Sequence, residues 1–187
     1  MRRFDEANAL DPNRELDQGL ARPRELLYAE RVTRWLLRLR PTASDALRLA
    51  ARCQHIRRWE IPRDSFPMTR EGYLRWKETL KRRHAEISGE ILQEVGCPEE
   101  VIQRVQSLNL KRDLHRDEEC QTLEDALCLV FLEHQLSELC TRTNEMKILT
   151  ALKKSWGKMS EAGREAALAM RLDSQSKRLL ALALQEG

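Results

Sequence analysis

The sequence predicts an all-α, single-domain protein that folds as a helical bundle. Apolar residues recur at helical spacing along most of the 187 residues, and no useful length of chain alternates apolar and polar residues. Seven glycines and six prolines leave few breaks between helices. A chain of this length is large enough for one core, so residues 1–187 are expected to form one domain.

The N-terminal half is expected to contain an arm followed by four helices. Residues 1–22 are polar and include an Asp-Pro-Asn turn, which favours an arm rather than a regular element. The periodic segments that follow predict helices over about 23–39, 44–59, 69–96 and 98–108. Their ends are marked by residues that cap or stop helices: Pro41, Thr42, Ser44, Thr69, Gly96 and Pro98.

The C-terminal half is expected to be built on one buried helix. Residues 120–139 form a helical segment that is apolar on every side between Leu123 and Glu133, which is typical of a helix at the centre of a bundle. Three shorter helices are expected over 145–155, 160–171 and 174–186, so residues 140–187 form a C-terminal helical part.

Charge and cysteine content argue against several classes of protein. The 33 basic and 30 acidic residues give a net charge of +3, a smaller positive excess than nucleic-acid-binding proteins usually carry. The five cysteines are odd in number and include no CxxC pair. With neither a signal peptide nor an apolar run near 18 residues, they are expected to be reduced thiols of a cytoplasmic protein without membrane spans.

The segment from Cys53 to Arg63 is the first candidate site. It contains an imidazole, three guanidiniums and an indole. On a helix that continues to Trp59, the residues Arg52, His55 and Trp59 would share one face, which could line a pocket with His55 as ligand or base. The alternative is a half-buried histidine beside solvated arginines.

The second candidate site lies in the buried helix. A buried carboxylate needs a cation, a backbone donor or a metal ion. Glu124 is explained by a position in the first helical turn, where the helix dipole favours negative charge. Asp125 is expected to point into the core, because Leu129 and Leu132 share its face, and we expect it to meet His55 and His84.

Arginines near His55 predict binding of phosphate. Guanidinium groups bind phosphate through two parallel hydrogen bonds. Arg58, three residues after His55, and Arg63, held by the preceding Pro62, are the preferred candidates. Arg75 and Trp76 are further candidates, and Trp76 could stack on a base. The alternative is that most of these arginines are only solvated.

Three segments resemble HD-domain phosphohydrolases. His55-Ile56-Arg57-Arg58-Trp59 resembles the HD helix in which a metal-binding histidine precedes an arginine by three residues. The segment 84–96 resembles a later HD helix, and Leu123-Glu124-Asp125-Ala126 resembles the helix with the last metal-binding aspartate. The resemblance covers residues 44–139. It implies a divergent HD-like core with extra terminal helices and one divalent metal ion at His55, His84 and Asp125.

One HD feature is missing from this sequence. Leu74-Arg75-Trp76 stands where the eponymous His-Asp pair is expected, and neither Arg75 nor Trp76 can bind a metal ion. Two of the four usual ligands are therefore absent. The secondary candidates for a ligand are Glu86, Glu124 and Asp64.

The chain also resembles, over nearly its whole length, the uncharacterised family called domain of unknown function 4202. The matching stretches are 11–13, 23–28, 54–63, 66–67, 72–76, 121–133 and 156–160. Members are sometimes labelled glutamyl-tRNA synthetase. That label is rejected here, because the synthetase loop that Lys158-Met159-Ser160 resembles works beside a parallel nucleotide-binding sheet, and no such unit is present. A helix cap at Ser160 is the simpler interpretation.

Two functions follow as expectations. In the first, the protein is an HD-like, metal-dependent hydrolase or lyase of a phosphorylated small molecule or nucleotide. In the second, it is a catalytically silent module of the same fold that binds a phosphate-bearing ligand or a protein partner. An RNA-binding role is disfavoured, since the sequence has no strong positive excess.

Overall fold

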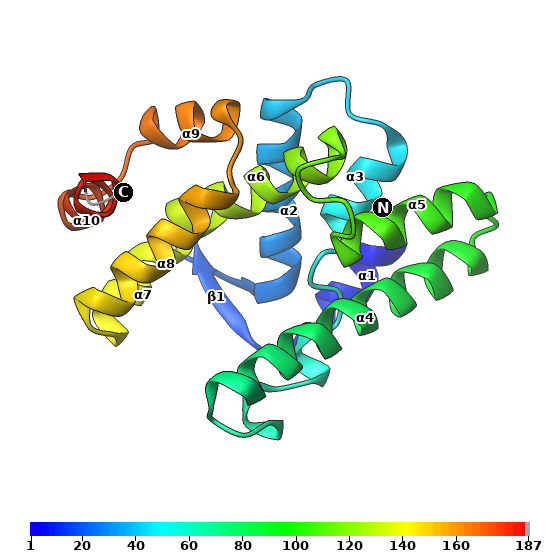
Figure 1. Cartoon of the computed structure of the whole chain (residues 1–187). Coiled ribbons are helices and arrows are strands. Elements are labelled where there is room, and N and C mark those ends of the chain that lie inside the picture. Colours follow the sequence, from blue (N-terminus) through cyan, green and yellow to red (C-terminus); the bar gives the residue numbers. More distant parts are fainter. Residues whose placement is uncertain (186–187) are drawn as a thin grey trace. The chain divides into compact units, whose positions relative to one another are not determined.

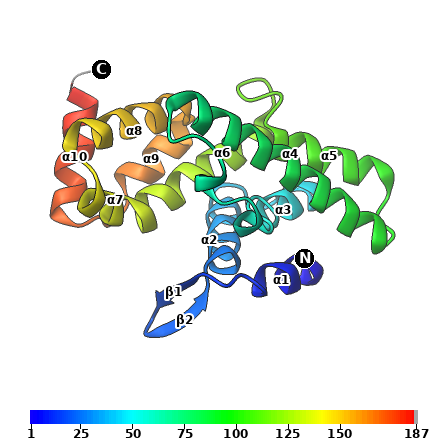
Figure 2. The same cartoon turned by 90° about the horizontal axis from the view of Figure 1, so that it is seen from below.

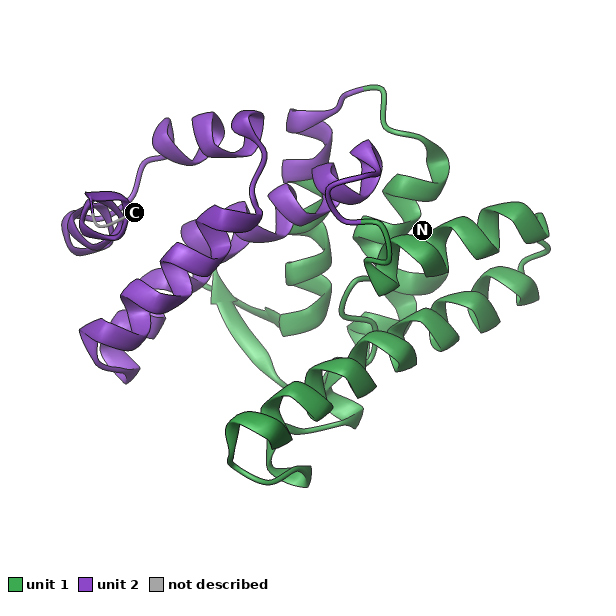
Figure 3. Ribbon diagram, viewed as in Figure 1, with its two compact units in different colours: residues 1–34, 42–113 green, residues 35–41, 114–187 purple. Residues whose placement is uncertain are grey.

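The computed structural model describes residues 1–185, and within them the chain is mostly helical with one short hairpin (Figure 1). These residues form two compact units, shown in Figure 3. Unit 1 comprises residues 1–34 and 42–113, and unit 2 comprises residues 35–41 and everything from residue 114 on. The expected single domain therefore stays a prediction, and each unit is described by itself.

Most of the predicted helices are confirmed within a few residues. The elements of the first part are α1 (Arg2–Ala9), β1 (Arg14–Asp17), β2 (Leu20–Pro23), α2 (Arg24–Leu39), α3 (Asp45–Arg52), two short 3₁₀ turns (Arg58–Glu60 and Arg63–Ser65), α4 (Arg70–Glu94) and α5 (Glu99–Leu110). Thr69 caps α4 as predicted, because its hydroxyl accepts a hydrogen bond from the Gly72 N–H at 3.1 Å.

The predicted N-terminal arm is wrong. Residues 2–9 form helix α1, and residues 14–23 form an antiparallel hairpin that projects beside α2 (Figure 2). Phe4 is 1% exposed, so even this polar segment buries an apolar face. The hairpin turn has positive φ at Gln18 (50°) and Gly19 (81°), as a tight two-residue turn requires.

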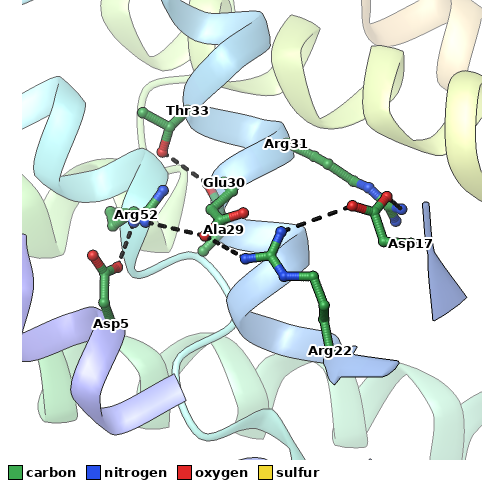
Figure 4. A network of polar contacts seen from close by, with 8 residues as sticks. All are labelled: Asp5, Asp17, Arg22, Ala29, Glu30, Arg31, Thr33 and Arg52. Carbon is green, nitrogen blue, oxygen red and sulfur yellow. Dashed lines mark hydrogen bonds and ion pairs between the residues drawn. The ribbon is translucent and has the colours of Figure 1, made fainter. Parts of the chain in front are cut away.

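Ion pairs join the hairpin and α1 to the rest of unit 1 (Figure 4). Arg31 of α2 donates to Glu15 at 2.5 Å and to Asp17 at 3.1 Å, with a side chain only 9% exposed. Arg22 donates to Glu30, and Arg52 donates to Asp5 of α1. The charged side chains of the N-terminal segment therefore largely form ion pairs that fix α1 and the hairpin in place. The polar composition of residues 1–22 does not by itself predict these contacts.

Helix α3 ends at Arg52, so the helix predicted to reach Trp59 is too long. The chain leaves the helix at Cys53 and passes through a turn in which Arg57 has a left-handed φ of 50°. The backbone N–H of Arg57 donates to Asn8 Oδ1 at 3.3 Å, a tertiary contact that stabilises this turn. Arg52, His55 and Trp59 consequently do not share one helical face.

Unit 2 contains the buried helix that the sequence predicts. Its elements are α6 (Glu118–Val130), a π-helical stretch (Phe131–Gln135), α7 (Leu136–Arg142), α8 (Glu145–Lys158), α9 (Glu161–Leu168) and α10 (Ser174–Gln185). Leu123, Ala126 and Leu129 are fully buried. The three short C-terminal helices are confirmed, and α10 packs against α7 and α8. The predicted end of the last helix, residue 186, lies outside the described residues.

Candidate functional site

The candidate site in unit 1 forms around His55, in the turn that follows α3. His55 Nδ1 lies 3.2 Å from Oε2 of Glu25, a residue in the first turn of α2. The imidazole stacks flat on the Tyr28 ring, with 4.0 Å between ring centres and 5° between planes. The stack and the carboxyl contact together fix the ring, so that its Nδ1 edge faces Glu25.

Arg58 and Trp76 complete the group. The Arg58 guanidinium lies over the Trp76 indole, with its central carbon 4.6 Å from the ring centre. Its Nε is 3.8 Å from Glu25 Oε1. Trp76 is 8% exposed, and its indole N–H donates a hydrogen bond to the Ile61 carbonyl at 2.9 Å. Trp76 therefore helps to hold the turn that follows α3 in place. We call Glu25, Tyr28, His55, Arg58 and Trp76 the His55 cluster.

Burial and nearby positive charge shift the pKa values of Glu25 and His55 in this cluster. Burial of Glu25, which is 7% exposed, raises its pKa to about 7, and the nearby Arg58 only partly offsets this effect. The pKa of His55 is lowered well below its usual value by burial first, and then by cations. These cations are Arg58, Lys111, Arg24 and Lys77. At neutral pH the imidazole is therefore neutral, and Glu25 is close to half-protonated.

His84 of α4 lies beside His55, with 5.8 Å between the ring centres. It is 4% exposed, and its Nε2 has no hydrogen-bond partner within residues 1–185. Burial lowers the pKa of His84 well below the usual value, and the neighbouring His55 and Arg58 act in the same direction. His55 and His84 therefore lie side by side within unit 1, whereas the predicted meeting of both histidines with Asp125 stays a prediction.

The other side chains that the sequence predicts to bind phosphate or metal make different contacts in the structure. Arg63 donates to three backbone carbonyls, those of Phe66, Pro67 and Thr69, and so holds its own loop together. Arg75 is exposed and lies 3.9 Å from Glu71. The secondary candidates also lie outside the cluster: Glu86 pairs with Arg83, and Asp64 is exposed in the short 3₁₀ turn.

Asp125 belongs to unit 2, where it holds the start of α9. It is 3% exposed, as predicted for an inward-pointing residue. Its carboxylate accepts hydrogen bonds from the Ser160 N–H at 2.8 Å, the Ser160 hydroxyl at 2.5 Å and Gln121 Nε2 at 3.0 Å. Its neighbour Glu124 pairs with Lys158 at 3.0 Å. The turn from Lys158 to Ser160 is thus a helix cap anchored by two buried carboxylates.

A metal ion at His55, His84 and Asp125 stays a prediction. Among residues 1–185, no group of three or more His, Cys, Asp or Glu side chains is placed to hold a metal ion. The carboxylate of Asp125 is already supplied with three donors inside unit 2. All five cysteines are free thiols, as expected.

Sequence reasoning missed Glu25 and Tyr28. Both fall in the stretch 23–28, which matched the uncharacterised family but carries no recognisable chemical motif. Glu25 also occupies a helix first turn, where an acidic residue is ordinarily explained by the helix dipole. Only the fold shows that its carboxyl is buried against an imidazole.

Comparison with known proteins places the chain in a family without assigning an activity. The family model described as "Domain of unknown function (DUF4202)" matches residues 1–180. The chain belongs to this family. No curated protein and no solved structure matches the DUF4202 chain significantly. Within residues 1–185, no helix of this DUF4202 member has both the length and the apolar content needed to cross a bilayer.

Proposed function

We propose that the His55 cluster binds the phosphate of a phosphorylated small molecule or a nucleotide. The observation that carries the proposal is the state of Arg58. This guanidinium is held in place over Trp76, yet it donates no hydrogen bond to any of residues 1–185. Its planar set of donors therefore remains available for an oxyanion, which guanidinium binds through two parallel hydrogen bonds.

The charge around Arg58 supports an anionic ligand. Arg24, Lys77 and Lys111 are close enough to lower the pKa of His55, as Arg58 does. Among residues 1–185, the carboxyl in contact with His55 is that of Glu25, and it gives up much of its negative charge because its pKa is raised to about 7. A phosphate would offset this concentration of positive charge, and salt would screen the attraction.

Isothermal titration calorimetry with inorganic phosphate, sugar phosphates and nucleotides tests the proposal. At low salt the wild type is expected to bind at least one of these compounds. Arg58→Gln should raise the Kd roughly 10-fold or more, because a charge-assisted hydrogen bond is lost. Arg58→Lys keeps the charge but loses the planar donor set, so it should weaken binding by a smaller factor.

Arg82→Gln is the matched control. Arg82 lies on α4 with a side chain 71% exposed, and the substitution removes the same charge from unit 1. It is expected to leave the Kd within about twofold, since charges screened at the surface contribute little. Equal weakening by both substitutions would mean that only net charge matters. The absence of binding by the wild type would contradict the proposal.

The HD-like fold and the bound metal ion that the sequence suggests remain separate proposals. An HD-like arrangement of residues 44–139, and a divalent ion bound within it, are not needed for an anion to bind at Arg58. Metal analysis of protein purified without a chelator or a metal-affinity tag tests the ion directly. A stoichiometric metal ion that is lost in His84→Ala would support it, and metal-free wild-type protein would rule it out.

A further inference from the structure

We infer that the exposed start of helix α4 binds the surface of a membrane that contains anionic phospholipids. The residues that form this surface, which we call the α4 tip, are Met68, Arg70, Tyr73, Leu74 and Lys77. All five are exposed and belong to unit 1, where α4 and the loop before it reach one end of that unit (Figure 3). None of the five belongs to the His55 cluster, so membrane binding here does not depend on phosphate binding at Arg58.

The α4 tip exposes three large apolar side chains. Met68 is 78% exposed, Leu74 is 56% exposed and Tyr73 is 44% exposed. Met68 lies two residues before α4 begins, and the other two lie in the first turns of the helix. Single exposed apolar residues are common on protein surfaces, whereas such a group within one short segment is typical of an interaction surface.

The loop that carries Met68 is held firmly against α4. Arg63 donates hydrogen bonds to three carbonyls of this loop. A Cβ at Gly72 would collide with the Pro67 carbonyl, so the missing side chain lets the loop pack directly on the helix. The Thr69 hydroxyl caps the helix at the same point. The loop is therefore fixed in a shape that exposes Met68, and little order is lost when a surface binds there.

Cations alternate with the apolar side chains on one face of α4. The spacing of a single helical face, i, i+3, i+4 and i+7, is followed by Arg70, Tyr73, Leu74 and Lys77. The Lys77 ammonium lies 5.6 Å from the centre of the Tyr73 ring, so charge and ring stand side by side. Further along the same face His84 is buried. The first turns of α4 therefore extend beyond the core of unit 1 and present this face to solvent.

The positive charge of the chain is concentrated around the α4 tip. Residues 57–83 include nine basic and four acidic residues, an excess larger than the net charge of +3 for the whole chain. The remainder of the chain is therefore slightly acidic. This asymmetry would orient the α4 tip toward an anionic surface, and salt would screen the attraction.

An anionic membrane fits both the charge and the apolar side chains of the α4 tip. Its headgroups attract the cations, and the acyl layer beneath them accepts the side chains of Met68 and Leu74. The Tyr73 ring, with an apolar body and a polar hydroxyl, suits the boundary between the two layers. Single-stranded RNA or an acidic peptide would pair with the cations but leave Met68 and Leu74 in water.

Sedimentation of the full chain with lipid vesicles tests membrane binding. Vesicles of equal parts phosphatidylcholine and phosphatidylserine should bind the wild type at low salt, and vesicles of phosphatidylcholine alone should bind it far less. Arg70→Gln should weaken binding about fivefold, and Leu74→Ser should weaken it roughly 10-fold. The matched controls are Arg82→Gln, on another face of α4, and Leu168→Ser, at an exposed leucine of unit 2. Each control should change binding by less than about twofold.

Three results of this experiment would overturn membrane binding by the α4 tip. The first is equal binding to both kinds of vesicle, or an equal loss in a tip variant and its control. The second is release of the protein by inorganic phosphate at the concentration of the lipid phosphate, because the vesicles would then only be supplying phosphate to Arg58. The third is binding to polyuridylate or polyglutamate without binding to the vesicles.

A second measurement locates the contact on the protein. Small discs of the same anionic lipids, with a nitroxide on the acyl chains, are added to protein that carries ¹³C in its methionine methyl groups. Met68 and Met146 are similarly exposed, at 78% and 73%, but Met146 belongs to unit 2. The nitroxide should strongly broaden the NMR signal of Met68 and leave that of Met146 sharp. Broadening of neither signal, or equal broadening of both, would overturn the inference even if the protein sediments with vesicles.

Discussion

Asp125→Ala is expected to lower the free energy of unfolding by about 3 kcal/mol. The substitution removes the acceptor of three hydrogen bonds: those from the N–H and the hydroxyl of Ser160, and one from the side-chain amide of Gln121, which also donates to the Lys158 carbonyl. The two Ser160 groups lie at the start of α9, so the loss should loosen the connection between α8 and α9. Chemical denaturation of the full chain, with helix content as the signal, measures the effect.

The control is Glu118→Ala, which removes an acidic residue from the same helix. Glu118 is 88% exposed, and its pair with Arg40 spans 3.5 Å, so the expected loss is below about 1 kcal/mol. Asp125→Asn keeps the shape and one oxygen and should fall between the two. Wild-type stability of Asp125→Ala would show that the carboxylate is solvated rather than bonded to Ser160.

A double-mutant cycle with Gly163 sharpens this test. A Cβ at Gly163 would lie 2.7 Å from the Asp125 carboxyl carbon, so Gly163→Ala should by itself cost about 1–3 kcal/mol. In the Asp125→Ala background the obstructing carboxyl is gone, and the same substitution should cost less. Strict additivity of the two losses would contradict the close approach of Gly163 to Asp125.

The second large effect is a dependence of stability on pH that comes from Glu25. Its pKa is about 7 in the folded chain and near 4.5 when solvated. The folded state therefore binds the extra proton between pH 4.5 and 7, so this group favours folding at low pH and loses that contribution as the pH rises through 7. The shift corresponds to at most about 3 kcal/mol between pH 4.5 and pH 8.

Comparison with Glu25→Gln isolates this contribution. His55 and His84 act in the opposite direction, because their lowered pKa values destabilise the folded state in acid. Subtracting the unfolding free energies of the variant from those of the wild type at each pH largely cancels the histidines. The wild type should lose stability relative to the variant from pH 5 to pH 8. A flat difference would show that the Glu25 carboxyl is not buried.

The sequence was sufficient where local patterns decide the structure. The caps at Thr69 and Ser160, the burial of the central helix and the inward direction of Asp125 all follow from spacing and residue type. The sequence was not sufficient where contacts between distant segments of the chain determine the structure. Helix α1 is held by burial of Phe4, and α3 is ended by a turn that Asn8 stabilises from another element.

The candidate site shows the same division. The sequence makes candidates of His55, His84, Arg58 and Trp76, because their side-chain types and spacing suggest chemistry. Their roles depend on neighbours that are distant in sequence. Glu25 contacts His55 from 30 residues away, and Arg63 is occupied by carbonyls of its own loop. Neither fact has a signal in the local sequence.

The most direct test of phosphate binding at Arg58 uses the four histidines of the chain as reporters. Inorganic phosphate and AMP are added to ¹⁵N-labelled protein, and the ring signals are followed by NMR. The His55 and His84 signals should move with saturation in the wild type, and they should move far less in Arg58→Gln, while those of His115 and His134 stay in place. Movement of His115 or His134 with no change at His55, or unchanged signals at all four histidines, would contradict an anion site at Arg58.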